Sequence, residues 1–219
     1  MLLINEIYAT ICGESRHTGR PCTLIRLTGC HVRCSWCDSA HSFSGGRRLS
    51  VDDVRRIVNE HGLSTVLVTG GEPLLQRAVG ELLAGLMDDG RRVLLETSGT
   101  VLPSTALGLS EVPVGVHRIV DIKAPGSGIP AEQIDWDGIA ALGAGDELKI
   151  VCAHREDFEW SAALVASDRL PDAATVSLSA VQGSLEAREL AEWIVNERLD
   201  VCFQIQLHRA VWPDLERGV

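Results

Sequence analysis

The chain has 219 residues, of which 45% are hydrophobic, and its 30 acidic and 20 basic side chains give a formal net charge of −10. This length and composition predict one globular domain, spanning residues 1–219, with a sizeable hydrophobic core. The acidic balance argues against general binding to nucleic acid or to an anionic membrane, since both require a basic surface.

Short apolar runs alternate with amphipathic stretches in the first half of the chain. The predicted elements are, in order, a strand at 23–29, a helix at 50–62, a strand at 65–71, a helix at 73–90 and a strand at 92–99. Ser50 is a preferred residue for the start of the first helix, and Gly62 for its end. Pro73 fits the first turn of the second helix, which Gly90 would stop.

The second half repeats this alternation more loosely. Its predicted elements are strands at 117–125 and 146–153, a helix at 155–168, a strand at 174–181, a helix at 184–199 and a last strand at 201–208. Strands that alternate with helices of this length indicate a parallel sheet. About six strands are too few for a closed eight-stranded barrel, so the expected fold is α/β, an open, partial (β/α) barrel of mostly parallel strands.

In such a fold the functional site lies at the C-terminal ends of the strands. The predicted strand ends carry the segments GC (29–30), TGGEP (69–73), ETSG (96–99), DIK (121–123), SAVQG (179–183) and QLH (206–208). We expect all six segments to face one mouth of the barrel.

The N-terminal stretch MLLINEIYATICGES lacks the basic region and the small-residue cleavage site of a signal peptide. No apolar run approaches the roughly 18 residues that a membrane span requires. These features predict a cytoplasmic protein without a membrane partner. In a reducing compartment, the seven cysteines are expected to be ligands or buried thiols rather than disulfides. Four of them are scattered and are expected to be core thiols: Cys12, Cys22, Cys152 and Cys202.

The other three cysteines, Cys30, Cys34 and Cys37, form a Cys-x3-Cys-x2-Cys pattern directly after the first predicted strand. Soft thiolate ligands favour zinc or an iron–sulfur cluster. A structural zinc site needs a fourth ligand, which His41 would supply. A four-iron cluster held by three cysteines instead leaves one iron open to an outside ligand, and an open position allows chemistry.

The TGGEP segment is a second sign of ligand binding. Its glycines, Gly70 and Gly71, allow backbone amides and carbonyls to approach a ligand closely. Glu72 adds an anion that would hold an ammonium group. On its own, the segment is equally typical of an ordinary strand-to-helix turn.

Taken with GGEP, the segment CHVRCSWC (30–37), with Trp36 in its aromatic position, resembles the radical S-adenosylmethionine (SAM) superfamily over most of the chain. The resemblance implies that three cysteines hold a [4Fe-4S] cluster whose open iron binds the amine and carboxylate of SAM. One electron, from a reductant such as flavodoxin or ferredoxin, then cleaves SAM to methionine and a 5′-deoxyadenosyl radical. The cofactor supplies that chemistry, and the protein positions it and excludes water.

Within the superfamily, the flanking residues resemble the 7-carboxy-7-deazaguanine synthase family. The matching pieces are GE (13–14), GRP (19–21), Arg26, CDS (37–39), ETSG (96–99) and QLH (206–208). This resemblance implies a barrel with trimmed helices, a homodimer, and a small pterin substrate, 6-carboxy-5,6,7,8-tetrahydropterin. It also implies a Mg2+-dependent radical ring contraction that releases ammonia and gives 7-carboxy-7-deazaguanine.

The functional positions of the family map onto this sequence residue by residue. Cys30, Cys34 and Cys37 are the implied cluster ligands, and Ser39 is the implied Mg2+ ligand, since magnesium prefers oxygen. The implied substrate contacts are Ile11, Cys12, Gly13, Glu14, Arg26, Thr97 and His208. The implied SAM contacts are Trp36, Cys37, Asp38, Gly71, Glu72, Gly99, Asp121, Ile122, Lys123, Ser179 and Gln182. No residue is assigned as a general acid or base.

For three of these substrate positions, the sequence also predicts a binding role or a location in the fold. The planar fork of Arg26 suits a carboxylate, which it binds in a bidentate manner. Glu14 suits the amino-pyrimidine end of a pterin. His208 is expected on the last strand.

Two positions depart from the family pattern. Cys12 replaces a glutamine, which weakens a hydrogen bond if the side chain contacts the substrate and has no effect if only the backbone does. Ser179 and Ala180 replace a Gln-Pro pair, which changes the contacts to the adenine or ribose of SAM.

Two other functions compete with this one. An activating enzyme for glycyl-radical proteins shares the Cys-x3-Cys-x2-Cys pattern, but GESRHTGRPCTLIR (13–26) and CDS (37–39) fit it less well. A zinc-binding or electron-transfer module without SAM chemistry leaves GGEP (70–73) and ETSG (96–99) without a role.

Overall fold

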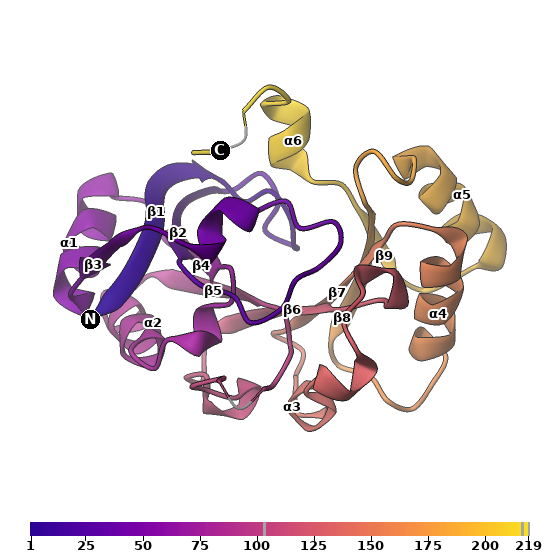
Figure 1. The fold of residues 1–219 in the computed structure, drawn as a ribbon, viewed down its shortest axis with the longest axis horizontal. Helices are drawn as coiled ribbons and strands as arrows, with labels where there is room; N and C mark the ends of the chain where they lie inside the picture. Colours follow the sequence, from indigo (N-terminus) through magenta and orange to yellow (C-terminus); the bar gives the residue numbers. More distant parts are fainter. Residues whose placement is uncertain (103, 216, 219) are drawn as a thin grey trace.

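A computed structural model describes residues 1–102, 104–215 and 217–218. Within these residues, nine strands form one sheet in the order β3-β1-β2-β4-β5-β6-β7-β8-β9. The sheet curls around its inner face without closing, and the longer helices lie outside it (Figure 1). This arrangement confirms the open, partial barrel of the α/β class.

Seven neighbouring strands are parallel, and each overlaps one of the seven segments predicted as strands. They are β2 (Pro21–Leu27), β4 (Thr65–Gly70), β5 (Arg92–Thr97), β6 (His117–Ile122), β7 (Glu147–Cys152), β8 (Thr175–Ala180) and β9 (Cys202–Gln204). Every residue of β4 is buried, as is typical of a strand covered on both faces.

The sequence analysis missed two antiparallel strands at one edge of the sheet. β1 (Leu2–Ile11) pairs with β2, and β3 (Arg47–Leu49) pairs with the other side of β1. A register shift between Ile4 and Glu6 interrupts the pairing of β1 with β2. The mixed sequence LLINEIYATI, which is largely half-buried, lacks the continuous apolar run by which the other strands were found.

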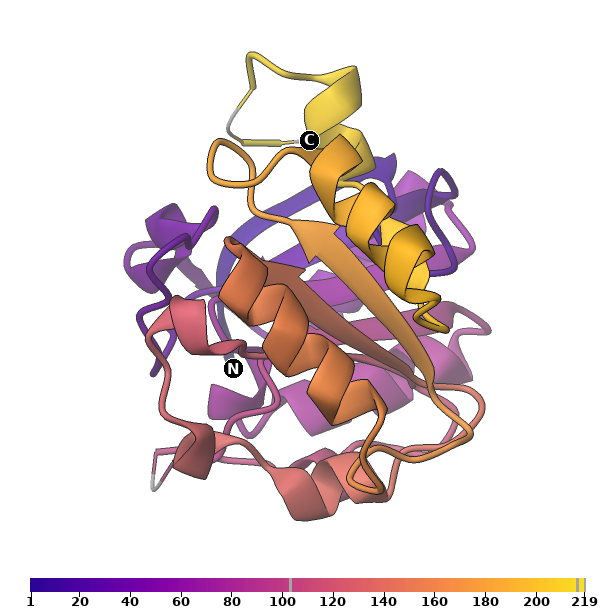
Figure 2. The same cartoon turned by 90° about the vertical axis from the view of Figure 1, so that its right-hand side faces the viewer.

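Four longer helices cover the outside of the barrel: α1 (Val51–His61), α2 (Val79–Asp88), α4 (Arg155–Val165) and α5 (Ala187–Glu197). The predicted ends of α1 are confirmed, because Ser50 Oγ accepts the backbone N–H of Asp53 at 3.0 Å and Gly62 adopts φ +68°. α4 packs on β7 and α5 on β8, and the two helices face the viewer together in Figure 2. Two short helices are α3 (Trp136–Ala140) and α6 (Leu207–Val211).

The predicted helix at 73–90 begins later than expected. Pro73–Leu75 is a 3-10 turn, and α2 starts only at Val79. The cause is Gln76, which is extended and whose side chain pairs with the backbone of Leu3, accepting from its N–H at 2.8 Å and donating to its carbonyl at 3.0 Å. This tie between the 3-10 turn and β1 prevents one continuous helix.

The predicted strand at 201–208 is also wrong in its second half. β9 ends at Gln204, and His208 lies in α6 rather than on a strand. The backbone N–H of Leu207 donates to the carbonyl of Gly13 at 2.9 Å, so the chain has left the ladder with β8 and turned toward the β1–β2 loop.

The hydrophobic core has two parts. The larger part lies between the outer face of the sheet and the helices. The smaller part, which we call the barrel floor, consists of Cys12, Cys22, Leu24, Leu67, Leu94 and Ile119. The strand residues of the barrel floor point to the inner face of the sheet. Side chains two residues apart on a strand share a face, and the residues two positions after Leu24, Leu67, Leu94 and Ile119 line the cavity described below. None of the described helices is long and apolar enough to cross a membrane.

The β1–β2 loop (residues 12–20) runs across the barrel toward β7 and β9. The backbone N–H of Arg16 donates to Glu147 Oε2 at 2.9 Å, and Arg16 Nε contacts Glu147 Oε1 at 3.2 Å. The backbone N–H of Ser15 donates to Gln204 Oε1 at 3.1 Å. The loop therefore joins the antiparallel edge of the sheet to the strands on the far side.

Candidate active site

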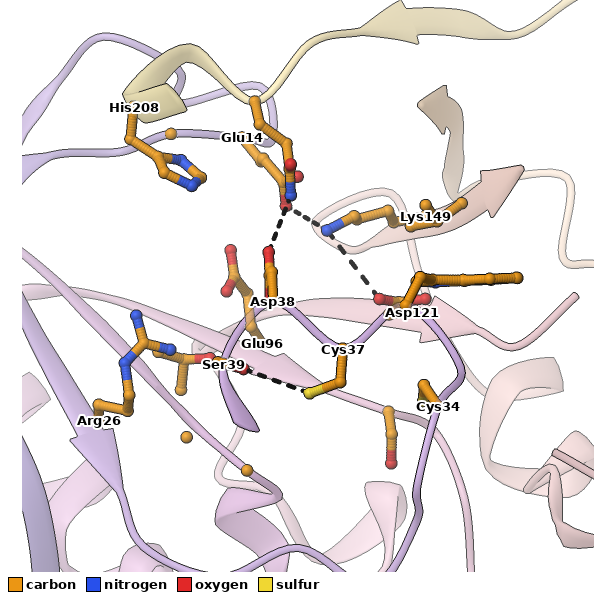
Figure 3. Close-up of a pocket in the computed structure, with 18 of the residues that line it drawn as sticks. Glu14, Arg26, Cys34, Cys37, Asp38, Ser39, Glu96, Asp121, Lys149 and His208 are labelled. Atoms are coloured by element: carbon orange, nitrogen blue, oxygen red, sulfur yellow. Dashed lines mark hydrogen bonds and ion pairs between the residues drawn. The ribbon is translucent and has the colours of Figure 1, made fainter. Parts of the chain in front are cut away.

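A cavity of about 420 Å³ opens at the C-terminal ends of the parallel strands. Its walls come from β1, β2, β4, β5, β6 and β7, from the segments after β2 and β8, and from α6. Its size falls in the range of small-molecule sites. Figure 3 shows side chains from distant parts of the sequence pointing into this space.

Most of the predicted site residues line the cavity. They are Ile11, Gly13, Glu14, Arg26, Cys30, Cys34, Trp36, Cys37, Asp38, Ser39, Gly71, Thr97, Asp121, Lys123, Gln182 and His208. The expectation that the strand-end segments face one mouth is met, since each of the six contributes at least one lining residue.

Five predicted positions do not line the cavity: Cys12, Glu72, Gly99, Ile122 and Ser179. The side chain of Cys12 is buried in the barrel floor and does not line the cavity. Ile122 belongs to the outer core. Ser179 is buried, and its hydroxyl has no hydrogen-bond partner among the described residues, while the neighbouring Ala180 lines the cavity.

Glu72 requires a correction. Its carboxylate is fully buried and accepts from the backbone N–H of Leu74 at 3.0 Å and from the hydroxyl of Thr97 at 2.8 Å. It also accepts from the backbone and the hydroxyl of Ser98, at 2.8 and 2.6 Å. These four bonds use the accepting capacity of the carboxylate, so Glu72 holds two strand ends together and has no lone pair left for an ammonium group.

The GGEP segment packs directly against the first cysteine. A Cβ atom on Gly71 would lie 2.3 Å from the carbonyl oxygen of Gly29 and 2.7 Å from Cys30 Cβ. The backbone N–H of Glu72 donates to that same carbonyl at 2.8 Å. Only glycine permits this approach, so the two motifs form one structural unit.

The three clustered cysteines are free thiols, each half-buried, on the segment after β2. Burial is the main cause that raises the pKa of Cys30 and of Cys34, so these thiols hold their protons until a metal displaces them. Among the described residues, no three His, Cys, Asp or Glu side chains lie close enough to bind a single metal ion. His41 lies 3.4 Å from Glu6 Oε2 instead of completing a zinc site. The donor set fits a polynuclear cluster, in which each thiolate binds its own iron.

Arg26 is fixed by residues of β1. Its Nε donates to Glu6 Oε2 at 3.1 Å, and both side chains are about one-sixth exposed at 16%. Burial opposes the charge most strongly, yet Tyr8 and Glu6 together raise the pKa of Arg26. The guanidinium is therefore a permanent cation at the cavity wall.

A chain of alternating charges crosses the far wall. Lys149 on β7 pairs with Glu14 Oε2 and lies 3.9 Å from Asp121 Oδ2, which in turn lies 3.0 Å from Lys123 Nζ. Burial works against the charge on Lys149, but Glu14 and Asp121 raise its pKa. The second oxygen of Glu14, Oε1, is buried without a partner among the described residues. This oxygen is an unused acceptor on a residue that lines the cavity.

α6 closes the top of the cavity. The ring of His208 covers Gly13 so closely that a Cβ atom there would lie 2.0 Å from Nδ1. Asp38, on the cluster segment, accepts from Gln206 Nε2 at 3.1 Å and lies 3.9 Å from Arg209. Burial lowers the pKa of His208, so its ring is neutral at neutral pH.

The sequence analysis missed several lining residues, of which Glu96, Lys149 and Tyr8 carry polar groups toward the site. Glu96 and Lys149 lie on strands that were predicted from their apolar residues alone. Tyr8 lies on β1, the strand that the sequence analysis missed. The available signal was the inward alternation: Glu96 lies one residue before Thr97 and two after the floor residue Leu94.

Comparisons with known proteins identify the family of this chain. A model of the radical SAM superfamily matches residues 24–120. A 7-carboxy-7-deazaguanine synthase from Chlorobaculum tepidum is 38% identical over 100% of this chain and 97% of its own length. The corresponding enzyme from Koribacter versatilis is 34% identical over 99% of both chains. The crystal structure of QueE from Escherichia coli shares the fold, with a TM-score of 0.68 and 23% identity over 93% of each chain.

Proposed function

Because this chain belongs to the 7-carboxy-7-deazaguanine synthase family of the radical SAM superfamily, we propose that it converts 6-carboxy-5,6,7,8-tetrahydropterin to 7-carboxy-7-deazaguanine with loss of ammonia. It is a radical SAM enzyme that uses a [4Fe-4S] cluster and SAM. The observation that carries the substrate proposal is that one cavity is lined by the three cysteines, Arg26 and Glu14, whose Oε1 is an unused acceptor.

The residues of the cavity divide into two ends. Cys30, Cys34 and Cys37 would hold the cluster, and the bound cluster and SAM supply the hydrogen-abstracting radical. Gly71 and Gln182 lie on the cavity wall where SAM is expected. A short-lived radical requires its target within contact distance, and a shared cavity of this size provides that proximity.

The other end fits an acidic pterin. Arg26 would bind the substrate carboxylate with its planar fork, since charge-assisted bidentate pairs are strong and directional. Glu14 Oε1 would accept from the amino-pyrimidine ring. The neutral ring of His208 lies over Gly13 above this end and limits the entry of water.

Ser39 is the proposed Mg2+ ligand. Its hydroxyl lies 3.9 Å from Cys37 Sγ, between the cluster segment and the substrate end of the cavity. A hydroxyl oxygen with substrate oxygens suits magnesium, which prefers oxygen donors. The metal would orient the substrate for rearrangement.

We also propose a homodimer, a one-electron reductant of the flavodoxin or ferredoxin type, and a cytoplasmic location. These rest on the family resemblance. The free thiols of the cavity support a reducing compartment, where such groups persist.

The test uses anaerobically reconstituted enzyme with dithionite, SAM, Mg2+ and 6-carboxy-5,6,7,8-tetrahydropterin. Mass spectrometry should find both 5′-deoxyadenosine and 7-carboxy-7-deazaguanine. A Cys34→Ala variant, the matched control, should lose iron and both products. Deoxyadenosine without the deazapurine, from wild-type enzyme with an intact cluster, would reject the proposed substrate and keep the radical chemistry.

A further inference from the structure

Two carboxyl groups face the cavity in different electrostatic settings. Glu14 forms an ion pair with Lys149. Glu96 lies on the inner face of β5, directly above the barrel floor, and is only partly accessible through the cavity that it lines. No basic nitrogen of the described residues comes within 4.0 Å of its carboxyl group.

The cations nearest to Glu96 are already engaged. Lys149 is shared between Glu14 and Asp121, and Arg26 donates its Nε to Glu6. From β4, the side chain of Thr69 lies near the Glu96 carboxyl and favours its ionised form. Of these two carboxyl groups, Glu14 has an ion-pair partner among the described residues and Glu96 does not.

Several neighbouring groups shift the pKa of Glu96. Burial is the largest influence and Glu14 the next, and together they outweigh Lys149, Arg26 and Thr69, raising the pKa of Glu96 to about 7. From the floor below, the thiols of Cys12 and Cys22 lie close enough to interact electrostatically with Glu96. The carboxyl of Glu96 is therefore mostly protonated below pH 7 and loses its proton as pH rises above 7.

We propose that Glu14 and Glu96 recognise two different hydrogen-bonding edges of the substrate, Glu14 as a carboxylate and Glu96 as a neutral carboxylic acid. This inference rests on the proposed function. A 2-amino-4-oxo-pyrimidine ring has one edge that only donates N–H groups and another where a carbonyl oxygen stands beside an N–H. An ionised carboxylate only accepts, so it fits the first edge, and a carboxylic acid donates and accepts, so it fits the second.

The protonated state of Glu96 avoids repulsion from an oxo ring. Two ionised carboxylates would place an anion against the ring carbonyl oxygen, where it repels. With Glu96 protonated, its O–H donates to that oxygen and its own carbonyl accepts from the adjacent N–H.

A Glu96→Gln variant tests the protonation state, because an amide donates and accepts as a neutral carboxylic acid does. Calorimetry measures Kd for 6-carboxy-5,6,7,8-tetrahydropterin on anaerobic holoenzyme with SAM and Mg2+. No reductant is added, so nothing turns over. At pH 6.5 we expect Glu96→Gln to bind within about threefold of wild type, and Glu96→Leu, which can do neither, to bind about tenfold or more weakly.

The pH dependence is the second measurement. Wild-type affinity should fall as pH rises above 7, approaching tenfold per pH unit as Glu96 loses its proton, while Glu96→Gln should lose this dependence. Glu189→Gln, an exposed α5 position, is the control and should follow wild type. Because titration of the substrate and of other residues is common to all variants, a difference between the profiles belongs to Glu96.

Two results would overturn the proposal: a wild-type Kd that does not change between pH 6.5 and 8.5, or a Glu96→Gln variant that binds tenfold more weakly at pH 6.5. If Glu96→Leu does not fold, these two measurements still decide. Failure of the proposed function is separate, since it would appear as wild-type enzyme that makes no deazapurine.

Discussion

Arg26 lines the cavity, and its Nε donates to Glu6. Although burial opposes its charge, Tyr8 and Glu6 together raise the pKa of Arg26. The family resemblance, together with the planar fork of this residue type, predicts a carboxylate-binding role for Arg26, which the structure places at the cavity wall. Its supporting residues were not predicted, because Glu6 and Tyr8 lie on β1, which was missed. Binding groups are thus easier to predict than the residues that orient them.

We expect Arg26→Ala to raise KM for the pterin substrate by about tenfold or more, for the loss of a charged hydrogen bond of about 1.5–3 kcal/mol. Iron content and SAM binding should stay unchanged. Steady-state kinetics with product detection measures the effect. An unaltered KM would remove Arg26 from the substrate site.

Glu6→Gln should raise KM less than Arg26→Ala does, because Glu6 acts only by orienting the guanidinium. In the double variant, Glu6→Gln should add nothing to Arg26→Ala, since there is no longer a side chain to orient. Additive effects of the two changes would show that Glu6 has a role of its own.

Ser39 is assigned from the family resemblance, and it lines the cavity with its hydroxyl 3.9 Å from Cys37 Sγ. Ser39→Ala should reduce the stimulation of turnover by Mg2+ while the iron content remains that of wild type. A Mg2+ titration of product formation measures this. Stimulation equal to that of wild type would exclude Ser39 as the metal ligand.

At the scale of elements, the parallel strands and the ends of α1 could be predicted because apolar runs and capping residues are local signals. The late start of α2 and the early end of β9 could not. Both follow from contacts between distant residues, the side chain of Gln76 with β1 and the N–H of Leu207 with Gly13. The second of these also moved His208 from a strand to α6 without removing it from the cavity.

The contact between GGEP and the cysteine segment is a contact between elements, and it depends on Gly71. Gly71→Ala should destabilise the fold by about 1–3 kcal/mol through overpacking and should lower iron retention, since Cys30 must move. Denaturant unfolding and iron analysis measure the two effects. Gly143→Ala is the matched control, because a Cβ there meets nothing within 4 Å. Equal stability of the two variants would contradict the close approach.

At the scale of the whole molecule, the open barrel depends on the β1–β2 loop to connect its two sides. Glu147, 1% exposed at the start of β7, accepts from two groups of Arg16 and lies 2.6 Å from His117 Nε2. The same loop carries Gly13 and Glu14 into the cavity. The anchor at the bottom of the barrel therefore positions the substrate end of the site, a long-range relation that local sequence patterns do not contain.

This anchor predicts a dependence of stability on pH. Burial favours the neutral acid most strongly, but hydrogen bonds from His117 and Arg16 outweigh it and lower the pKa of Glu147. A carboxyl group with a lowered pKa stabilises the fold fully above its ordinary value of about 4.3, and this contribution is lost as pH falls through its pKa in the folded protein. Glu147→Gln should therefore be less stable than wild type at pH 7 by about 1–3 kcal/mol.

The same difference should shrink as pH falls below the ordinary value for glutamate, because the wild-type carboxylate becomes protonated and resembles the amide. Urea unfolding of both proteins at pH 7 and at successively lower pH measures the difference, with exposed Glu189→Gln as the control. A difference that stays constant as pH falls would mean that the neutral acid anchors the loop as well as the anion does. Because the loop carries Glu14, the Glu147→Gln variant should also bind the pterin more weakly at pH 7, which links the stability of the barrel to its site.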